Sequence, residues 1–94
     1  MTQDATGSVL IEHEVGLHAR PSVKLTKLAK TFRSRIEFAA SIEGPWVDAK
    51  SIVKVMGSKT PNGATLHFRA QGEDAATAVQ ALIELVERDF DLAS

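Results

Sequence analysis

The chain has 94 residues, 44% of them hydrophobic and 24% charged, a length that suits one small domain and excludes a large multidomain enzyme. Eleven Lys and Arg against twelve Asp and Glu give a net charge of −1, so no overall basic excess favours binding to nucleic acid. The absence of cysteine excludes disulfides, cysteine-ligated zinc and thiol catalysis.

The first half of the chain reads as strand, helix, strand and short strand. Apolar alternation predicts a strand at Val9–His13. Pro21 suits the first turn of a helix, which an apolar stripe at helical spacing then continues through Leu25, Leu28, Ala29 and Phe32. A second strand is expected over Arg35–Ala40, with Ile36 and Phe38 on one face. After a turn, Trp46–Asp48 can return as a third strand.

The second half reads as short helix, strand and helix. Ser51 is a good N-cap for a short helix at Ile52–Met56. A turn then leads to a last strand at Ala64–Ala70. Gly72-Glu73-Asp74 opens the final helix, because acidic residues complement the positive end of a helix dipole. Its expected buried stripe is Ala75, Val79, Leu82 and Val86.

The order β-α-β-β-α-β-α predicts an α+β fold, an open-faced β-sandwich. Its four-stranded antiparallel sheet would carry three helices on one face, with the other face in solvent. Four polar strand residues fit a solvated face: Glu12, Glu37, His67 and Arg69. We expect a single domain over residues 1–94, with residues 1–7 as a flexible N-terminal extension.

No secretory signal and no apolar stretch long enough to span a bilayer occur in the chain. We therefore expect a cytoplasmic monomer that neither inserts into membranes nor binds nucleic acid. His13 and His67 fall on predicted strands, and the three histidines lack metal-ligand spacing, so we expect no metal site and no cofactor.

His18 differs from the other histidines because it lies in the segment GLHARP, directly before the first predicted helix. The start of a helix presents unpaired N–H groups and the positive end of the dipole, which together attract anions. An imidazole there can carry a phosphoryl group covalently, and Arg20 can stabilise its charge. From the residues alone, an ordinary loop histidine is the alternative.

The segment GLHARP resembles the active-site signature of HPr, the histidine-containing phosphocarrier family of the bacterial phosphoenolpyruvate-dependent phosphotransferase system. The resemblance extends over roughly residues 9–90. The segment at residues 48–52 (DAKSI) resembles the regulatory segment of the family, and residues 62–65 and 72–74 resemble its later turns.

The resemblance implies a phosphocarrier that is not an independent catalyst. The histidine matching His18 receives a phosphoryl group at Nδ1 from phospho-Enzyme I and passes it to an EIIA-type protein. The arginine matching Arg20 contacts that group. The serine matching Ser51 is phosphorylated in some bacteria by an HPr kinase/phosphorylase, although Ser51 as a helix cap alone stays an alternative.

A partner-binding face can be predicted beside His18. Arg20, Lys24 and Lys27 share one side of the first helix, where they can steer an acidic partner, although such a run is also ordinary for a solvated face. Lys50 and Lys54 can extend this patch. Ile52, Val53 and Met56 can supply apolar contacts.

Two departures from the family pattern concern partners. The family often carries a Leu-Gly-hydrophobic group after the second helix, where this chain has Ser58-Lys59-Thr60. The hairpin around Ile42–Trp46 looks about two residues longer, and no role for Trp46 follows from the sequence. These departures fit a regulatory branch better than sugar uptake.

Four functions are compatible with the sequence to different degrees. The leading hypothesis is a phosphoryl carrier, with a regulatory HPr-like protein of a nitrogen-type phosphotransferase system as the alternative. A binder that acts through phospho-Ser51 alone is disfavoured by His18 and Arg20. A small hydrolase with His18 as base lacks a convincing nucleophile and an orienting carboxylate.

Overall fold

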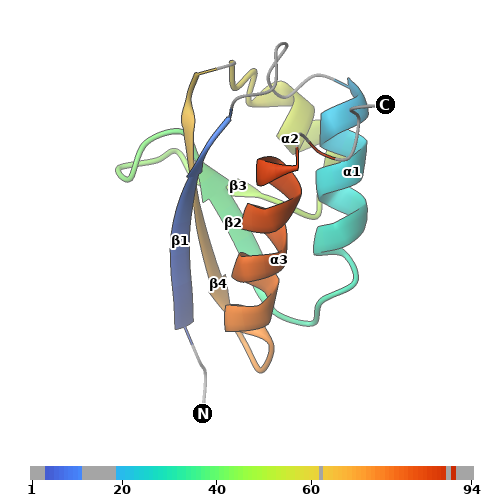
Figure 1. Ribbon diagram of the computed structural model, residues 1–94, viewed down its shortest axis with the longest axis vertical. Coiled ribbons are helices and arrows are strands. Elements are labelled where there is room, and N and C mark those ends of the chain that lie inside the picture. The colour runs from blue at the N-terminus through green and yellow to red at the C-terminus, as the bar shows by residue number, and fades with distance from the viewer. Residues whose placement is uncertain (1–3, 12–18, 62, 89, 91–94) are drawn as a thin grey trace.

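The computed structural model describes residues 4–11, 19–61, 63–88 and 90 of the chain (Figure 1). The elements follow the order β-α-β-β-α-β-α. They are β1 (Asp4–Leu10), α1 (Ala19–Ala29), β2 (Arg35–Ala39), β3 (Val47–Asp48), α2 (Ile52–Gly57), β4 (Thr65–Gln71) and α3 (Ala75–Glu87).

The four strands form one antiparallel sheet in the order β1-β4-β2-β3. β4 lies between β1 and β2, so strands from the two ends of the chain are neighbours. All three helices lie on the same side of this sheet, and the other side is uncovered (Figure 1). The predicted fold is therefore confirmed, including the open face.

The core lies between the sheet and the helices. Ile36 and Phe38 of β2 and Leu66 and Phe68 of β4 point into it, as their alternation predicts. The predicted stripe of α3 is also buried, since Ala75, Val79, Leu82 and Val86 are each at most 4% exposed. Each fully buried aliphatic or aromatic side chain contributes about 1.5–3 kcal/mol, so this one core can hold the small fold together.

The predicted position of the first strand is wrong. β1 begins at Asp4 and pairs with β4 from Asp4↔Gln71 to Leu10↔Thr65, so residues 4–7 are not part of a flexible extension. The apolar alternation that predicts a strand is weak over residues 4–8, because Gly7 occupies an inward position without a side chain. A Cβ there would lie 2.6 Å from Cδ1 of Ile83, which shows how closely β1 approaches α3. The last two residues of the predicted strand, Glu12 and His13, lie outside the described residues.

The loop before β2 is tied to the start of α3. Asp74 accepts hydrogen bonds from the backbone N–H groups of Arg33 and Ser34, each at 2.9 Å, and from the Ser34 hydroxyl. These bonds, above all the one from the Ser34 hydroxyl, lower the pKa of Asp74 to about 2. Asp74 occupies the N-cap position of α3 but its side chain does not cap that helix, so it acts as a link between two loops.

Candidate functional site

The helix predicted to follow His18 begins at Ala19, the next residue in the chain. His18 itself lies outside the described residues, as does His13. Arg20 is exposed in the first turn of α1, while Pro21 and Ser22 are buried. Since Pro suits the first turn of a helix and the first N–H groups have no intrahelical partner, the local structure that the GLHARP segment predicts after His18 is present.

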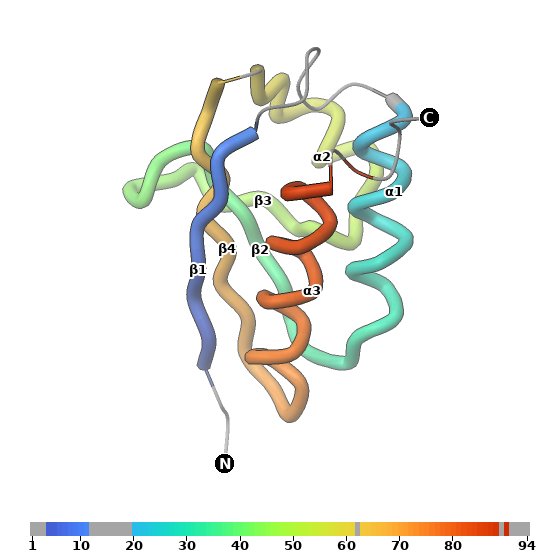
Figure 2. Tube along the Cα trace, in the orientation of Figure 1, coloured from blue at the N-terminus to red at the C-terminus, as the bar shows by residue number. Residues whose placement is uncertain are grey.

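α2 lies against α1, and both helices reach the same end of the molecule, as the tube shows at its upper right (Figure 2). Ser51 is the N-cap of α2: its backbone is extended, and its Oγ accepts a hydrogen bond from Lys54 N at 3.3 Å. The predicted capping role of Ser51 is therefore confirmed. The cap also places the Ser51 hydroxyl at the surface of this pair of helices, where it is half-buried.

The cations predicted to contact partners differ in availability. Arg20, Lys24 and Lys27 are all exposed on α1, and Lys54 is exposed on α2. Lys50 is different, because its Nζ donates a 2.7 Å hydrogen bond to the carbonyl oxygen of Phe32 and its side chain is half-buried. Lys50 thus joins the start of α2 to the end of the α1 region and is less available to a partner than the other four.

The predicted apolar contacts lie on α2. Val53 is 78% exposed and Met56 is 43% exposed, whereas Ile52 is half-buried. Val55, on the opposite side of the same helix, is fully buried in the core. Two large apolar side chains are therefore presented to solvent on a six-residue helix.

The open face of the sheet carries paired polar groups. The guanidinium of Arg69 lies 4.1 Å from the centre of the Trp46 ring, and its Nε is 2.9 Å from Oε1 of Glu37. The hydroxyl of Ser8 is 2.8 Å from Nδ1 of His67. Trp46, for which the sequence suggested no role, packs against this charged group and contributes a cation–π contact.

His67 lies on β4 with a half-buried side chain, at the strand position that the sequence predicts. Its Nδ1 lies beside the neutral Ser8 hydroxyl. Over the described part of the chain no carboxylate orients its ring as a catalytic triad requires. The same part of the chain contains no group of three or more His, Asp or Glu side chains arranged to hold a metal ion.

Comparisons with known proteins agree with this arrangement. A family model described as the PTS HPr component phosphorylation site matches residues 5–88. The phosphocarrier protein HPr of Xylella fastidiosa (strain 9a5c) is 39% identical over 83 residues, which cover 88% of this chain and 91% of that protein. The phosphocarrier protein NPr of Proteus mirabilis is 34% identical over 83 residues, with the same coverage of 88% and 91%.

A solved structure extends the agreement to three dimensions. HPr-C-His from Thermoanaerobacter tengcongensis superposes with a TM-score of 0.86 at 30% identity, over 96% of this chain and 99% of that one. The chain belongs to the HPr family. HPr proteins are phosphocarriers of the phosphotransferase system, so the predicted class of function is confirmed.

The HPr fold here separates charge in a way that the sequence reasoning missed. Residues 19–34, with α1, and residues 51–63, with α2, hold seven of the eleven cations and none of the twelve acids. These cations are Arg20, Lys24, Lys27, Lys30, Arg33, Lys54 and Lys59. Within the described ranges, no ion pair involves their side chains. A count of acids per predicted helix would have found this signal despite the net charge of −1.

The departure from the HPr pattern after α2 has a definite structure. The Ser58 hydroxyl donates to the carbonyl oxygen of Val55 at 2.7 Å and lies 3.0 Å from the Thr60 hydroxyl. Thr60 is only 4% exposed, and Lys59 adopts a left-handed backbone conformation with φ 51°. The three residues therefore form an ordered turn that ends α2, with Lys59 exposed at its centre.

No helix in the described ranges is long and apolar enough to cross a membrane.

Proposed function

We propose that this HPr protein accepts a phosphoryl group from phospho-Enzyme I on Nδ1 of His18 and passes it to a histidine of an EIIA-type protein. The observation that carries the proposal is the start of α1. His18 immediately precedes this eleven-residue helix in the sequence, and Arg20 is exposed in its first turn. The first N–H groups of the helix and the Arg20 guanidinium can stabilise negative charge on a phosphorylated His18.

The transfer requires no redox partner. The lone pair of His18 Nδ1 attacks phosphorus, a P–N bond forms on His18, and the bond from phosphorus to the donor residue of Enzyme I breaks. In the second transfer the bond on His18 breaks as a new bond forms on the acceptor histidine. The attacking Nδ1 must carry a free lone pair, so it is the neutral imidazole of His18 that accepts the phosphoryl group.

Both partners are proposed to dock on the surface formed by α1 and α2. Its exposed cations, Arg20, Lys24, Lys27 and Lys54, can attract an acidic surface and accelerate encounter. Val53, Met56 and the half-buried Ile52 can then be covered by apolar groups of the partner. Lys50, predicted for the same role, would contribute less because it is hydrogen-bonded to Phe32.

Ser51 is proposed as a regulatory phosphorylation site, with an HPr kinase/phosphorylase as the enzyme that modifies it. Ser51 is the N-cap of α2, which contacts α1. A phosphate there would add about −1.5 to −2 charges to a surface whose charged residues are all cations. The added charge would repel an acidic partner. The fold would survive, because only one capping hydrogen bond is at stake.

A second candidate is a regulatory role in a nitrogen-type phosphotransferase system without direct sugar transport. The turn at Ser58-Lys59-Thr60 favours it because it departs from the usual HPr pattern, and the relatives include an NPr protein at 34% identity. The phosphoryl chemistry would be the same and only the acceptor would differ. In either case a cytoplasmic monomer is the expected form.

The proposal is tested by incubating the chain with Enzyme I, phosphoenolpyruvate and magnesium, and measuring its intact mass. We expect a gain of one phosphoryl group that is lost in acid and stable in alkali, as a phosphoramidate is. His18→Ala should abolish the gain, and His13→Ala and His67→Ala serve as matched controls that keep it. Normal labelling of the His18→Ala protein would show that His18 is not the acceptor.

A further inference from the structure

Lys59 occupies a backbone conformation that lysine rarely adopts. Its φ of 51° lies in the left-handed region, where the Cβ of an ordinary residue crowds the backbone and glycine is favoured. Glycine at this position would therefore relieve strain. A lysine kept where glycine would be more stable suggests a use for its side chain.

The turn around Lys59 holds the backbone of this residue in place. Its backbone N–H donates to the carbonyl oxygen of Met56 at 3.3 Å, and its neighbours are joined by the contact between the Ser58 and Thr60 hydroxyls. The buried Thr60 anchors the far side of the turn. Lys59 thus projects from an ordered base rather than from a loose loop.

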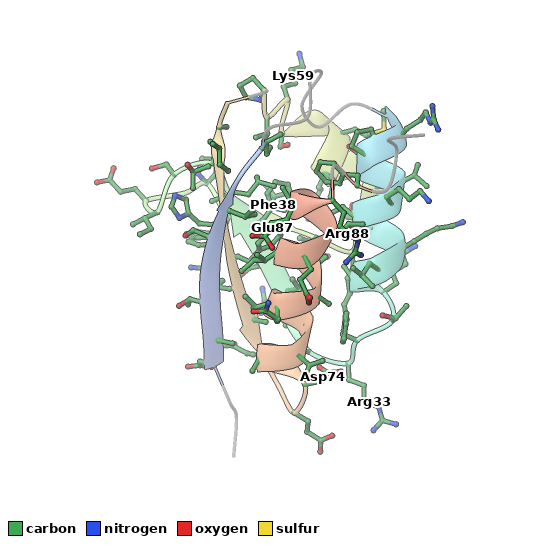
Figure 3. The ribbon with its side chains drawn as sticks, viewed as in Figure 1. Arg33, Phe38, Lys59, Asp74, Glu87 and Arg88 are labelled. Carbon is green, nitrogen blue, oxygen red and sulfur yellow. The ribbon has the colours of Figure 1, made fainter. Side chains whose placement is uncertain are left out.

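Figure 3 shows the Lys59 side chain pointing away from the protein, at the end of the molecule where α2 lies and α1 begins. Its ammonium group makes no ion pair or hydrogen bond with any described residue. Asp74 and Arg33, which are also labelled, lie at the opposite end of the molecule. Lys59 is therefore at the end that the proposed function assigns to phosphoryl transfer.

We infer that Lys59 is a specificity-determining docking residue, which selects a partner whose contact surface carries a carboxylate beside an apolar patch. The inference rests on the proposed function. Neither residues 19–34 nor residues 51–63 contain an acid, so these two segments supply no carboxylate for Lys59 and leave it to an acidic partner. The apolar patch would meet Met56 and Val53, which are exposed on the helix that this turn ends.

The charge of Lys59 would exclude partners as well as attract them. A partner surface that is apolar throughout would cover the ammonium group without replacing its water, which is unfavourable. Specificity of this kind comes from a difference between two affinities and needs an element that penalises the wrong partner. Where HPr sequences carry a Leu-Gly-hydrophobic group, Ser58-Lys59-Thr60 would therefore shift preference toward an acidic acceptor or donor.

Lys59→Gly separates this role from a structural one, because the two roles predict opposite results. Removing strain should raise the melting temperature, while removing the charge should weaken binding of the unphosphorylated protein to Enzyme I by about threefold at low salt. Lys59→Glu should weaken it by about tenfold, and both effects should shrink at high salt. Lys30→Glu is the matched control, since it makes the same change of charge in the turn that follows the other end of α1.

Titration of Enzyme I with each variant measures the dissociation constant, and phosphoryl transfer is measured in parallel. Equal weakening by Lys59→Glu and Lys30→Glu would assign the effect to net charge and overturn the inference, as would parent-like binding of Lys59→Gly at low salt. If the parent binds but gains no phosphoryl group, the proposed function fails while the dissociation constants still decide the role of Lys59. A parent that does not bind Enzyme I overturns the docking role itself.

Discussion

The surface formed by α1 and α2 and the open face of the sheet differ in whether their charged side chains are paired. On the open face, Arg69 is bound to Glu37 and stacked on Trp46, and Arg35 lies 3.9 Å from Glu37. In residues 19–34 and 51–63, which contain α1 and α2, the side chains of seven cations have no ion-pair partner among the described residues. Charges that are neutralised within the fold contribute to its stability, whereas charges left without a counterion remain available to another molecule.

The difference follows from the geometry of the two surfaces. Neighbouring strands bring Arg69 opposite Glu37 in the register, so opposite charges meet at a distance that the sheet sets. Helical spacing brings Arg20, Lys24 and Lys27 onto one side, so like charges meet instead. Like charges on a helix cost a few tenths of a kcal/mol each, and an acidic partner would remove that cost.

The largest expected effect comes from removing two charges from each surface in turn. Lys24→Gln with Lys27→Gln should slow phosphoryl transfer from Enzyme I by about tenfold at low salt, with the free energy of unfolding nearly unchanged. Arg35→Gln with Arg69→Gln changes the net charge equally, but should leave transfer unchanged. The second pair should lower the free energy of unfolding by about 1–2 kcal/mol, because two exposed ion pairs and a cation–π contact are lost.

The transfer rate and the free energy of unfolding in urea, measured for both double variants, show which pair changes which quantity. Trp46, the single tryptophan, also reports on the second pair, because its fluorescence should shift when Arg69 no longer covers the ring. If both pairs slow transfer equally, net charge alone guides the encounter and the two surfaces are not distinct.

Ser51 allows a negative charge to be placed among the unpaired cations. Ser51→Asp should slow transfer from Enzyme I by a few-fold at low salt and less at high salt. Ser51→Ala is the control for loss of the cap, and should transfer normally while losing about 1 kcal/mol or less of stability. Transfer at the parent rate by both Ser51→Asp and protein phosphorylated on Ser51 would leave Ser51 as a helix cap only.

The smallest effect is expected at Asp74, which lies at the end of the molecule away from Lys59 (Figure 3). Because its pKa is lowered to about 2 in the folded protein, Asp74 contributes stability that is fully present above its unfolded pKa of about 4. That contribution is lost as the pH falls from about 4 through 2. The urea midpoint should therefore fall less steeply over this range in Asp74→Asn than in the parent, with phosphoryl transfer at pH 7 unaffected.

A denaturation series for both proteins between pH 4 and pH 2 measures the difference. Glu73→Gln is the matched control, because Glu73 is the neighbouring exposed acid and holds no loop. An equal pH dependence in Asp74→Asn and the parent would show that the bonds from Ser34 and Arg33 do not favour the charged carboxylate.

The sequence alone was most informative where a residue acts through its neighbours in the chain. Ser51 was predicted as an N-cap because a hydroxyl three residues before Lys54 can reach its N–H, and the structure shows that bond. The stripe of α3 was predicted from helical spacing and is buried. The GLHARP segment and the helix start likewise rest on residues adjacent in sequence, while the family resemblance combines several such short segments along residues 9–90.

Reasoning from local pattern failed where contacts join distant segments. β1 was placed five residues too late because Gly7 offers no apolar signal, and only the close approach of Ile83 on α3 explains a glycine there. Trp46 had no predicted role because its partner Arg69 is on another strand. Lys50 was assigned to the docking surface from its place beside the second helix. Its bond to Phe32 was not foreseen, because that bond joins residues 18 positions apart.

The order of the elements, the inward faces of β2, β4 and α3, and the family can all be predicted from the residues, since hydrophobic spacing, capping and short motifs are properties of neighbours in the chain. Which charges are paired depends instead on the folded arrangement. The register of the sheet brings Arg69 to Glu37, and the contact between α1 and α2 gathers cations from two segments on one side of the molecule. Electrostatic interactions depend on distance in space, which separation along the chain does not specify.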